Sequence, residues 1–122
     1  MKKLTLILLI LTFFSCNFGK NGIIAEIKNS SEKTVRNVIF YSDENTKIEF
    51  EKIEPNQTVK KFLDMTNNHK GDGAYGLIFE RENGKKEQTP GGYYTNGGSL
   101  DRKVTFEIKN DSILMKFSGI GY

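Results

Sequence analysis

The sequence has few of the residues that cross-link a small protein or bind metals. It contains one cysteine, one histidine and no tryptophan among 122 residues. A single cysteine excludes an internal disulfide, and one histidine without a second thiol leaves too few ligands for a typical zinc site. We therefore expect no metal and no cofactor, and a fold held together by packing and hydrogen bonds.

The sequence also lacks a hydrophobic run long enough to cross a bilayer. Residues 4–14 are apolar except for Thr5 and Thr12, whereas a spanning helix needs about 20 apolar residues. The run follows Lys2 and Lys3 and ends close to the only cysteine. A basic start, a short apolar middle and a small residue before a cleavage site are typical of a secretory signal. The sequence therefore predicts export.

The end of this run, Phe13-Phe14-Ser15-Cys16, resembles the lipobox of bacterial lipoproteins, with Phe13 where leucine is more common. The resemblance implies cleavage after Ser15 and a diacylglyceryl thioether on Cys16, whose amine is acylated. One acyl chain binds a membrane only marginally, but two or three give lasting attachment. The alternative is an ordinary signal peptide followed by a free thiol.

The resemblance implies three segments. We expect a lipoprotein signal peptide over residues 1–15, a lipidated flexible tether over residues 16–22 and one β-sandwich domain over residues 23–122. The protein would lie in the cell envelope, anchored to a membrane through the lipid on Cys16. The outer membrane, facing the periplasm, is the location we favour.

The charge of the mature chain is nearly balanced. Removal of Lys2 and Lys3 leaves 16 of the 18 basic side chains against 15 acidic ones. The basic residues are scattered, whereas a nucleic-acid-binding protein carries a clustered basic patch. We therefore expect no nucleic-acid partner.

Alternation of apolar and polar residues, rather than helical spacing, runs through the mature chain. Seven stretches show this pattern, and they cover residues 23–27, 35–41, 47–52, 59–65, 74–80, 104–109 and 113–118. Such alternation, rich in β-branched and aromatic residues, indicates half-buried strands. The sequence predicts an all-β fold, a single antiparallel β-sandwich of about 7–8 strands. A small open barrel or a meander is the alternative.

Turn signals separate these stretches. Asn83-Gly84 predicts a tight type I′ hairpin, since both residues tolerate positive φ. Residues 110–111 are expected to close the last hairpin. Residues 29–38, followed by residues 55–58, resemble the opening of immunoglobulin-like and fibronectin-type-III-like export domains. This resemblance implies a sandwich and implies no activity.

Residues 90–99 form the most distinctive mature segment, in which four glycines flank two tyrosines. The plain interpretation is a long connection whose tyrosines fold back onto the sheet edge. The other interpretation is a recognition loop, because tyrosine supplies a large contact area at low entropic cost and Gly, Asn and Thr adapt around it. The candidate binding residues are Tyr93, Tyr94, Thr95 and Asn96.

Two further positions are of interest. His69 lies in a polar loop with Asn67, Asn68 and Asp72, which offers fewer oxygen ligands than calcium needs, so we interpret His69 as a solvated loop residue. Ser112, within Asp111-Ser112-Ile113, matches an O-glycosylation motif found in exported proteins of one Gram-negative phylum.

Together these features lead to a functional expectation. We expect a non-enzymatic, membrane-anchored envelope lipoprotein whose β domain binds a protein or glycan partner, with inhibitor or immunity lipoproteins as a subclass that fits in size and location. The alternative is an envelope hydrolase or sugar-processing enzyme that uses the His69 loop and the Tyr93/Tyr94 loop. The alternative requires these loops to meet around a concave site.

Overall fold

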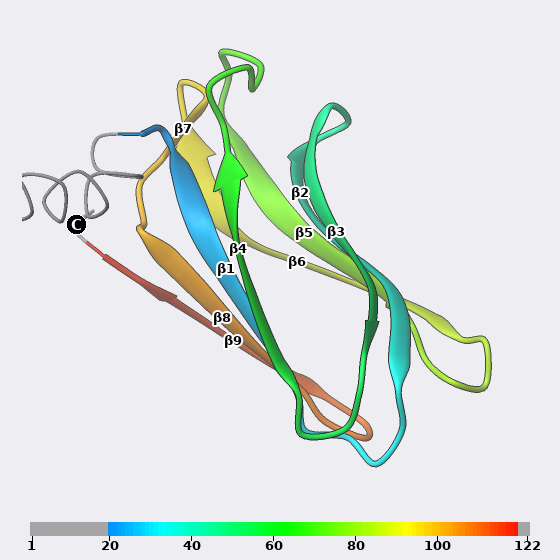
Figure 1. Cartoon of the computed structure of the whole chain (residues 1–122). Helices are drawn as coiled ribbons and strands as arrows, with labels where there is room; N and C mark the ends of the chain where they lie inside the picture. Colours follow the sequence, from blue (N-terminus) through cyan, green and yellow to red (C-terminus); the bar gives the residue numbers. More distant parts are fainter. Residues whose placement is uncertain (1–19, 120–122) are drawn as a thin grey trace, which may run out of the picture.

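The computed structural model describes residues 20–119, which form two packed β-sheets (Figure 1). Every regular element in this range is a strand. The predicted all-β sandwich is therefore confirmed. No helix in the described range is long and apolar enough to cross a membrane.

The first sheet has four strands in the order β4-β1-β8-β9. Their bounds are β1 Gly22–Asn29, β4 Thr58–Asp64, β8 Lys103–Ile108 and β9 Ile113–Ser118. The β1–β4 and β8–β9 pairs are antiparallel, but β1 and β8 pair in parallel through the middle of the sheet. The antiparallel prediction therefore holds for all strand pairs except this one.

The second sheet has five strands in the order β3-β2-β5-β6-β7, all antiparallel. Their bounds are β2 Val35–Asp43, β3 Thr46–Ile53, β5 Gly73–Glu80, β6 Lys86–Thr95 and β7 Gly98–Ser99. The total of nine strands in the described residues exceeds the predicted 7–8. The two strands that were not predicted, β6 and β7, come from the segment that includes residues 90–99.

The core lies between the sheets and consists of alternate apolar residues from the predicted stretches together with Ile53 and Tyr94, which lie outside them. Phe40 of β2 stacks on Tyr75 at 5.5 Å between ring centroids and meets Phe106 of the other sheet edge-on at 5.6 Å. All three side chains are buried. Burial of one large apolar side chain contributes roughly 1.5–3 kcal/mol, so these contacts across the interface hold the two layers together.

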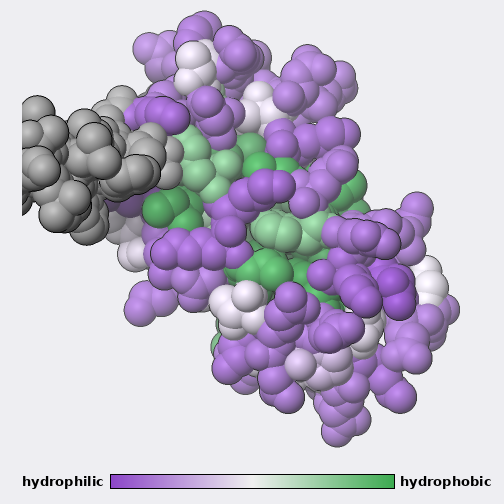
Figure 2. Space-filling model, viewed as in Figure 1, coloured by the Kyte–Doolittle hydropathy of each residue, from purple (hydrophilic) through white to green (hydrophobic). Residues whose placement is uncertain are grey.

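One side of the sandwich is closed by the edge strands β3 and β4. Phe50 of β3 and Val59 of β4 are half-buried and pack against the core, and Lys61 places its ammonium 5.6 Å from the centroid of the Phe50 ring. Figure 2 shows hydrophobic surface between the charged side chains along this side. Side chains of β3 and β4, rather than a further strand, therefore cover the core on this side.

The connections between the strands lie at two opposite ends of the molecule, as the strand directions require (Figure 1). We call the end where β1 begins the N-terminal pole and the opposite end the distal pole. The N-terminal pole carries residues 44–45, 65–72, 96–97 and 100–102. The distal pole carries residues 30–34, 54–57, 81–85 and 109–112.

The expected flexible tether extends less far than residue 22. Gly22 is already part of β1. The Asn21 side chain donates hydrogen bonds to the Met65 and Gly97 carbonyls, both at 3.1 Å, and accepts one from the Ser99 N–H at 3.3 Å. The last two residues of the predicted tether therefore belong to the folded domain. The predictions for Ser15 and Cys16 lie outside the described residues.

Candidate functional site

The tyrosine-containing segment is mostly strand rather than loop, because β6 continues to Thr95. Tyr94 is buried, its hydroxyl donates to the Ser42 carbonyl at 2.9 Å, and its ring lies 5.4 Å from that of Tyr75. Tyr93 points outward and is 47% exposed. The prediction that Tyr94 contacts a partner is therefore wrong, because its ring fills the core.

Thr95 and Asn96 are used to hold the β6–β7 turn against the β4–β5 connection. The Thr95 hydroxyl and the Asn96 N–H both donate to Asp72 Oδ1, at 2.7 and 3.0 Å. These bonds, led by the one from Thr95 and supplemented by one from the Tyr93 hydroxyl, hold the pKa of Asp72 below its usual range. Of the four candidate binding residues, only Tyr93 and Asn96 are exposed.

His69 is held at the same pole by Asp43. The His69 N–H donates to Asp43 Oδ2 at 3.0 Å, and the ring nitrogen Nδ1 lies 3.3 Å from the same oxygen. The backbone bond is the main reason that the pKa of Asp43 falls to about 2. The His69 ring also meets Tyr94 edge-on at 5.8 Å.

The two loops named in the enzymatic alternative therefore do lie side by side. They supply a His–Asp pair, but the neighbouring hydroxyl of Ser42 donates to Asn68 Oδ1 at 2.8 Å and is not directed to His69. Neither of the two pockets described below is lined by these loops. Within residues 20–119, no three His, Cys, Asp or Glu side chains cluster closely enough to hold a metal ion.

Ser112 lies at the distal pole, in the hairpin between β8 and β9. The residues around the turn, from Lys109 to Ser112, are exposed, and the Lys109 N–H donates to the Ser112 carbonyl at 2.8 Å. The predicted last hairpin is confirmed at this position. The Ser112 hydroxyl is therefore accessible to a modifying enzyme.

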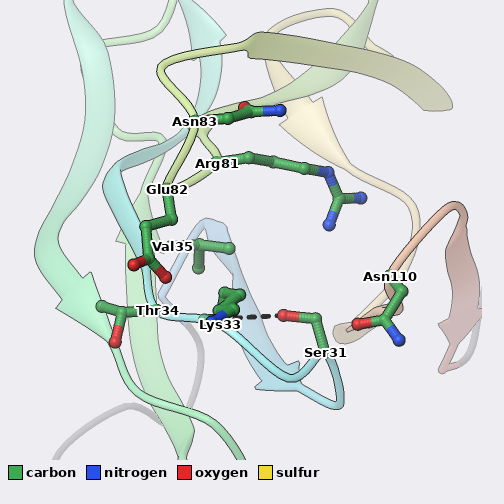
Figure 3. A pocket seen from close by; sticks show the side chains of 8 residues that line it. All are labelled: Ser31, Lys33, Thr34, Val35, Arg81, Glu82, Asn83 and Asn110. Atoms are coloured by element: carbon green, nitrogen blue, oxygen red, sulfur yellow. Dashed lines mark hydrogen bonds between the residues drawn. The ribbon is translucent and has the colours of Figure 1, made fainter.

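The distal pole also contains a pocket of about 380 Å³, within the range of ~300–1,000 Å³ typical of small-molecule sites. It is formed by three separate connections (Figure 3). Its lining residues are Ser31, Lys33, Thr34, Val35, Arg81, Glu82, Asn83 and Asn110. Three segments that are far apart in the sequence thus contribute to one site.

Arg81 is the central residue of this distal pocket. Its Nε donates to Glu87 at 2.7 Å, its Nη1 donates to the Lys109 carbonyl at 2.8 Å, and its guanidinium lies 5.3 Å from the Phe79 ring centroid. The remaining nitrogen, Nη2, is buried and has no hydrogen-bond partner in the described part of the chain. A buried donor left without a partner costs about 1–3 kcal/mol, and more when it is charged.

The hydrogen-bond acceptors around the pocket are mostly occupied. Asn83 Oδ1 accepts from the Lys85 N–H at 3.0 Å, and Asn110 Oδ1 accepts from the Glu32 N–H at 2.8 Å. The Ser31 hydroxyl donates to the Lys33 carbonyl at 2.9 Å (Figure 3). Because backbone N–H groups bind the two amide oxygens, the amide nitrogens are the ends left free. Apart from the Glu82 carboxylate, the side chains that line the pocket therefore present mainly donors.

A second hollow, of about 520 Å³, lies on the outer face of the five-stranded sheet. Its charged lining residues are Glu49, Glu51, Glu80 and Lys86. Lys86 pairs with Glu80 at 3.7 Å. This face agrees with the alternation of charged and apolar residues along the strands and has no buried unpartnered group of the kind found at Arg81.

The sequence pattern predicts turns at Asn83-Gly84 and at residues 110–111, which contribute to the distal pocket, but it predicts no site there. The first of these turns differs from the prediction, since Gly84 has φ +85° but Asn83 is not among the described residues with positive φ. The Arg81 N–H donates to the Lys85 carbonyl and the Gly84 N–H to the Arg81 carbonyl. The resulting five-residue connection, rather than a two-residue turn, places Arg81 and Asn83 at the pocket.

Comparisons with known proteins address the fold alone. No family model matches the chain, and no curated protein matches it. A solved structure described as the NMR structure of a protein from Eubacterium rectale superimposes with a TM-score of 0.55 at 11% sequence identity, covering 84% of this chain and 93% of that one. At this identity the chain shares a fold with that protein, and the likeness carries no information on activity.

Proposed function

We propose that the protein is a non-enzymatic, lipid-anchored lipoprotein of the cell envelope that binds a protein or glycan partner through the distal pocket. The observation that supports this most is that the pocket is lined by residues of the connections at the pole opposite the start of β1. Figure 1 shows these connections at that end of the molecule. A tether attached ahead of Lys20 holds the N-terminal pole toward the membrane. The distal pocket then faces away from the bilayer.

The expected membrane anchor makes a weak site useful. Attachment confines the protein to a thin layer next to the membrane and raises its effective concentration for other envelope components. The outer membrane, facing the periplasm, is the location we propose.

The first experiment tests the anchor. Cells expressing the protein are fed an alkyne-bearing fatty acid, and labelling is compared between the natural chain, Cys16→Ala and the neighbouring control Asn17→Ala. We expect the label on the natural chain and on Asn17→Ala, both in the membrane fraction. Label that persists on Cys16→Ala, or a natural chain without label, contradicts the proposed anchor.

The second experiment tests which pole meets the partner. A photo-crosslinking amino acid replaces Glu82 at the rim of the pocket or, as the control, Asn96 at the N-terminal pole; both positions are exposed. We expect irradiation of intact cells to yield a defined adduct from position 82 and none from position 96. Adducts that form only from position 96 would move the binding surface to the N-terminal pole and refute the proposed site.

A further inference from the structure

The distal pocket has a chemical preference that follows from its groups. We infer that it takes a ligand bearing a carboxylate, which Arg81 Nη2 and the amide nitrogen of Asn83 bind at one end of the pocket. The inference rests on the proposed function, because it specifies the ligand of the same site. The ligand group that the pocket binds is a carboxylate, and either a peptide C-terminus or an acidic sugar supplies one.

The first argument is the imbalance between donors and acceptors. Backbone N–H groups occupy the side-chain oxygens of Asn83 and Asn110. The free groups are the Asn83 amide nitrogen, the Lys33 ammonium and Arg81 Nη2, which has no partner among the described residues. A ligand that supplies two acceptor oxygens with a negative charge complements this set, since hydrogen bonds between charged groups are roughly twice as strong as neutral ones.

The second argument is that Arg81 is already fixed in place. Its side chain is 14% exposed and is held by Glu87, by the Lys109 carbonyl and by the face of the Phe79 ring. Binding therefore costs little additional side-chain entropy at this residue. Nη2 is covered in this structure, so a ligand reaches it only when a neighbouring group at the pocket moves aside.

The third argument concerns the opposite end of the pocket. Glu82 contributes the only carboxylate among the lining residues, and Figure 3 shows it on the side of the pocket away from the Arg81 guanidinium. A second negative group at that end would be repelled, whereas an amide, amine or hydroxyl would be accepted. The ligand should therefore carry one carboxylate and, a few bonds away, a hydrogen-bond donor.

The test compares matched charged and neutral probes. The full chain, purified in a non-ionic detergent, is titrated calorimetrically with N-acetyl-alanyl-alanine and its C-terminal amide, and with glucuronate and glucose. We expect the carboxylate member of at least one pair to bind about tenfold more tightly than its neutral twin, a gain typical of one charge-assisted contact. The peptide pair and the sugar pair distinguish the two sources of the carboxylate.

Two outcomes overturn the inference in different ways. If charged and neutral twins bind equally, the pocket binds ligands without recognising charge, and the proposed function survives. If neither carboxylate binds, the inference fails, and the proposed function is then judged by the crosslinking experiment alone. These results therefore separate the failure of the ligand assignment from the failure of the proposed site.

Variants show whether the binding takes place at this pocket. Asn83→Asp keeps an oxygen to accept from the Lys85 N–H but replaces the free amide nitrogen with a negative oxygen. Asn67→Asp, an exposed position at the other pole, makes the same change in net charge. We expect the first variant to lose at least about tenfold in carboxylate affinity and the second to bind as the natural chain does; equal behaviour of the two contradicts the inference. The test uses Asn83, which is exposed, and leaves the partly buried Arg81 and its contacts unchanged.

Discussion

The two poles of the sandwich differ in how their polar side chains are used. At the N-terminal pole, Asn21, Asp43 and Asp72 each bind two or more groups from neighbouring turns. At the distal pole, the connections leave a pocket between them. The guanidinium nitrogen Nη2 of Arg81, a residue that lines this pocket, is buried and has no partner within the described residues. The N-terminal pole also keeps one buried nitrogen without a partner among the described residues, Asn68 Nδ2, but that residue lines neither pocket. Within residues 20–119, only at the distal pole does an unpartnered buried nitrogen belong to a pocket-lining residue.

This difference shows that composition alone does not identify a binding surface. Tyrosine, glycine and asparagine are enriched in the segment at the N-terminal pole, as they are in recognition loops, yet there they close the end of the sandwich. The distal pocket is built from ordinary turn residues. A candidate site is better identified where a polar group without a partner belongs to a residue that lines a pocket, as Arg81 does.

The largest expected effect tests the packing of the N-terminal pole. Tyr94→Ala removes a buried ring and its bond to the Ser42 carbonyl, and truncation of a buried aromatic residue costs about 3–5 kcal/mol. The neighbouring Tyr93→Ala, with a ring that is 47% exposed, should cost much less. Urea unfolding of both variants checks this, and equal losses would show that Tyr94 is not a core residue.

A pair of glycines compares the two poles directly. Gly97 and Gly84 have φ of +73° and +85°, but a Cβ on Gly97 would lie 2.6 Å from the His69 carbonyl oxygen, whereas a Cβ on Gly84 meets nothing within 4 Å. Alanine in a left-handed conformation costs about 1–2 kcal/mol, and overpacking adds about 1–3 kcal/mol. We expect Gly97→Ala to be clearly more destabilising than Gly84→Ala by urea unfolding. A reversed order would mean that the N-terminal pole is the more open one.

The Asp43–His69 contact predicts a pH dependence. The pKa of Asp43 is lowered from 3.8 to about 2, chiefly by the His69 N–H, so the folded state favours the charged carboxylate by about 2 kcal/mol. This stability is present above the unfolded pKa and is lost as pH falls through the folded pKa. Asp43→Asn should therefore cost about 2 kcal/mol at pH 7 and only a small fraction of that at pH 2.

Chemical unfolding across this pH range measures the Asp43 contribution. The matched control is Asp111→Asn on the exposed distal hairpin, for which we expect a small and constant difference from the natural chain. A loss in Asp43→Asn that stays the same from pH 7 to pH 2 would show that the carboxylate charge is not what stabilises this turn.

The smallest expected effect on stability is at Ser112. Ser112→Ala changes an exposed hairpin residue and should alter the unfolding free energy by less than about 0.5 kcal/mol. If the native host glycosylates this site, the variant loses the mass of the glycan, which mass spectrometry detects. A natural chain whose mass equals that of the lipidated polypeptide contradicts the prediction of a modification.

Most of the fold could be predicted because alternation reports directly on burial. All seven predicted stretches lie on strands, and their inward positions, such as Ile23, Val38 and Leu77, are buried. Strand β6 was missed because Pro90, Gly91 and Gly92 weaken the pattern. In the structure, a Cβ on Gly91 would overlap the Met115 side chain, and one on Gly92, which has a φ of +72°, would overlap the Phe117 ring.

The distal pocket could not be predicted because it depends on which turns become neighbours. Ser31, Arg81 and Asn110 lie in three different connections, and nothing in their local sequence links them. The parallel pairing of β1 with β8 brings the ends of these strands together at the distal pole. No pattern with a period of two residues encodes this long-range pairing.

The parallel pair also determines how the domain bears mechanical load. β1 begins next to the N-terminal segment and is hydrogen-bonded to β4 on one side and to β8 on the other. Tension applied along β1 from its start, while the distal pole is held, acts across the cross-strand bonds, which are perpendicular to β1 in the antiparallel β1–β4 ladder and slanted in the parallel β1–β8 ladder. The hydrogen bonds of both ladders are then loaded in shear at the same time instead of opening one after another. The strand at which the load enters is therefore held by hydrogen bonds on both of its edges.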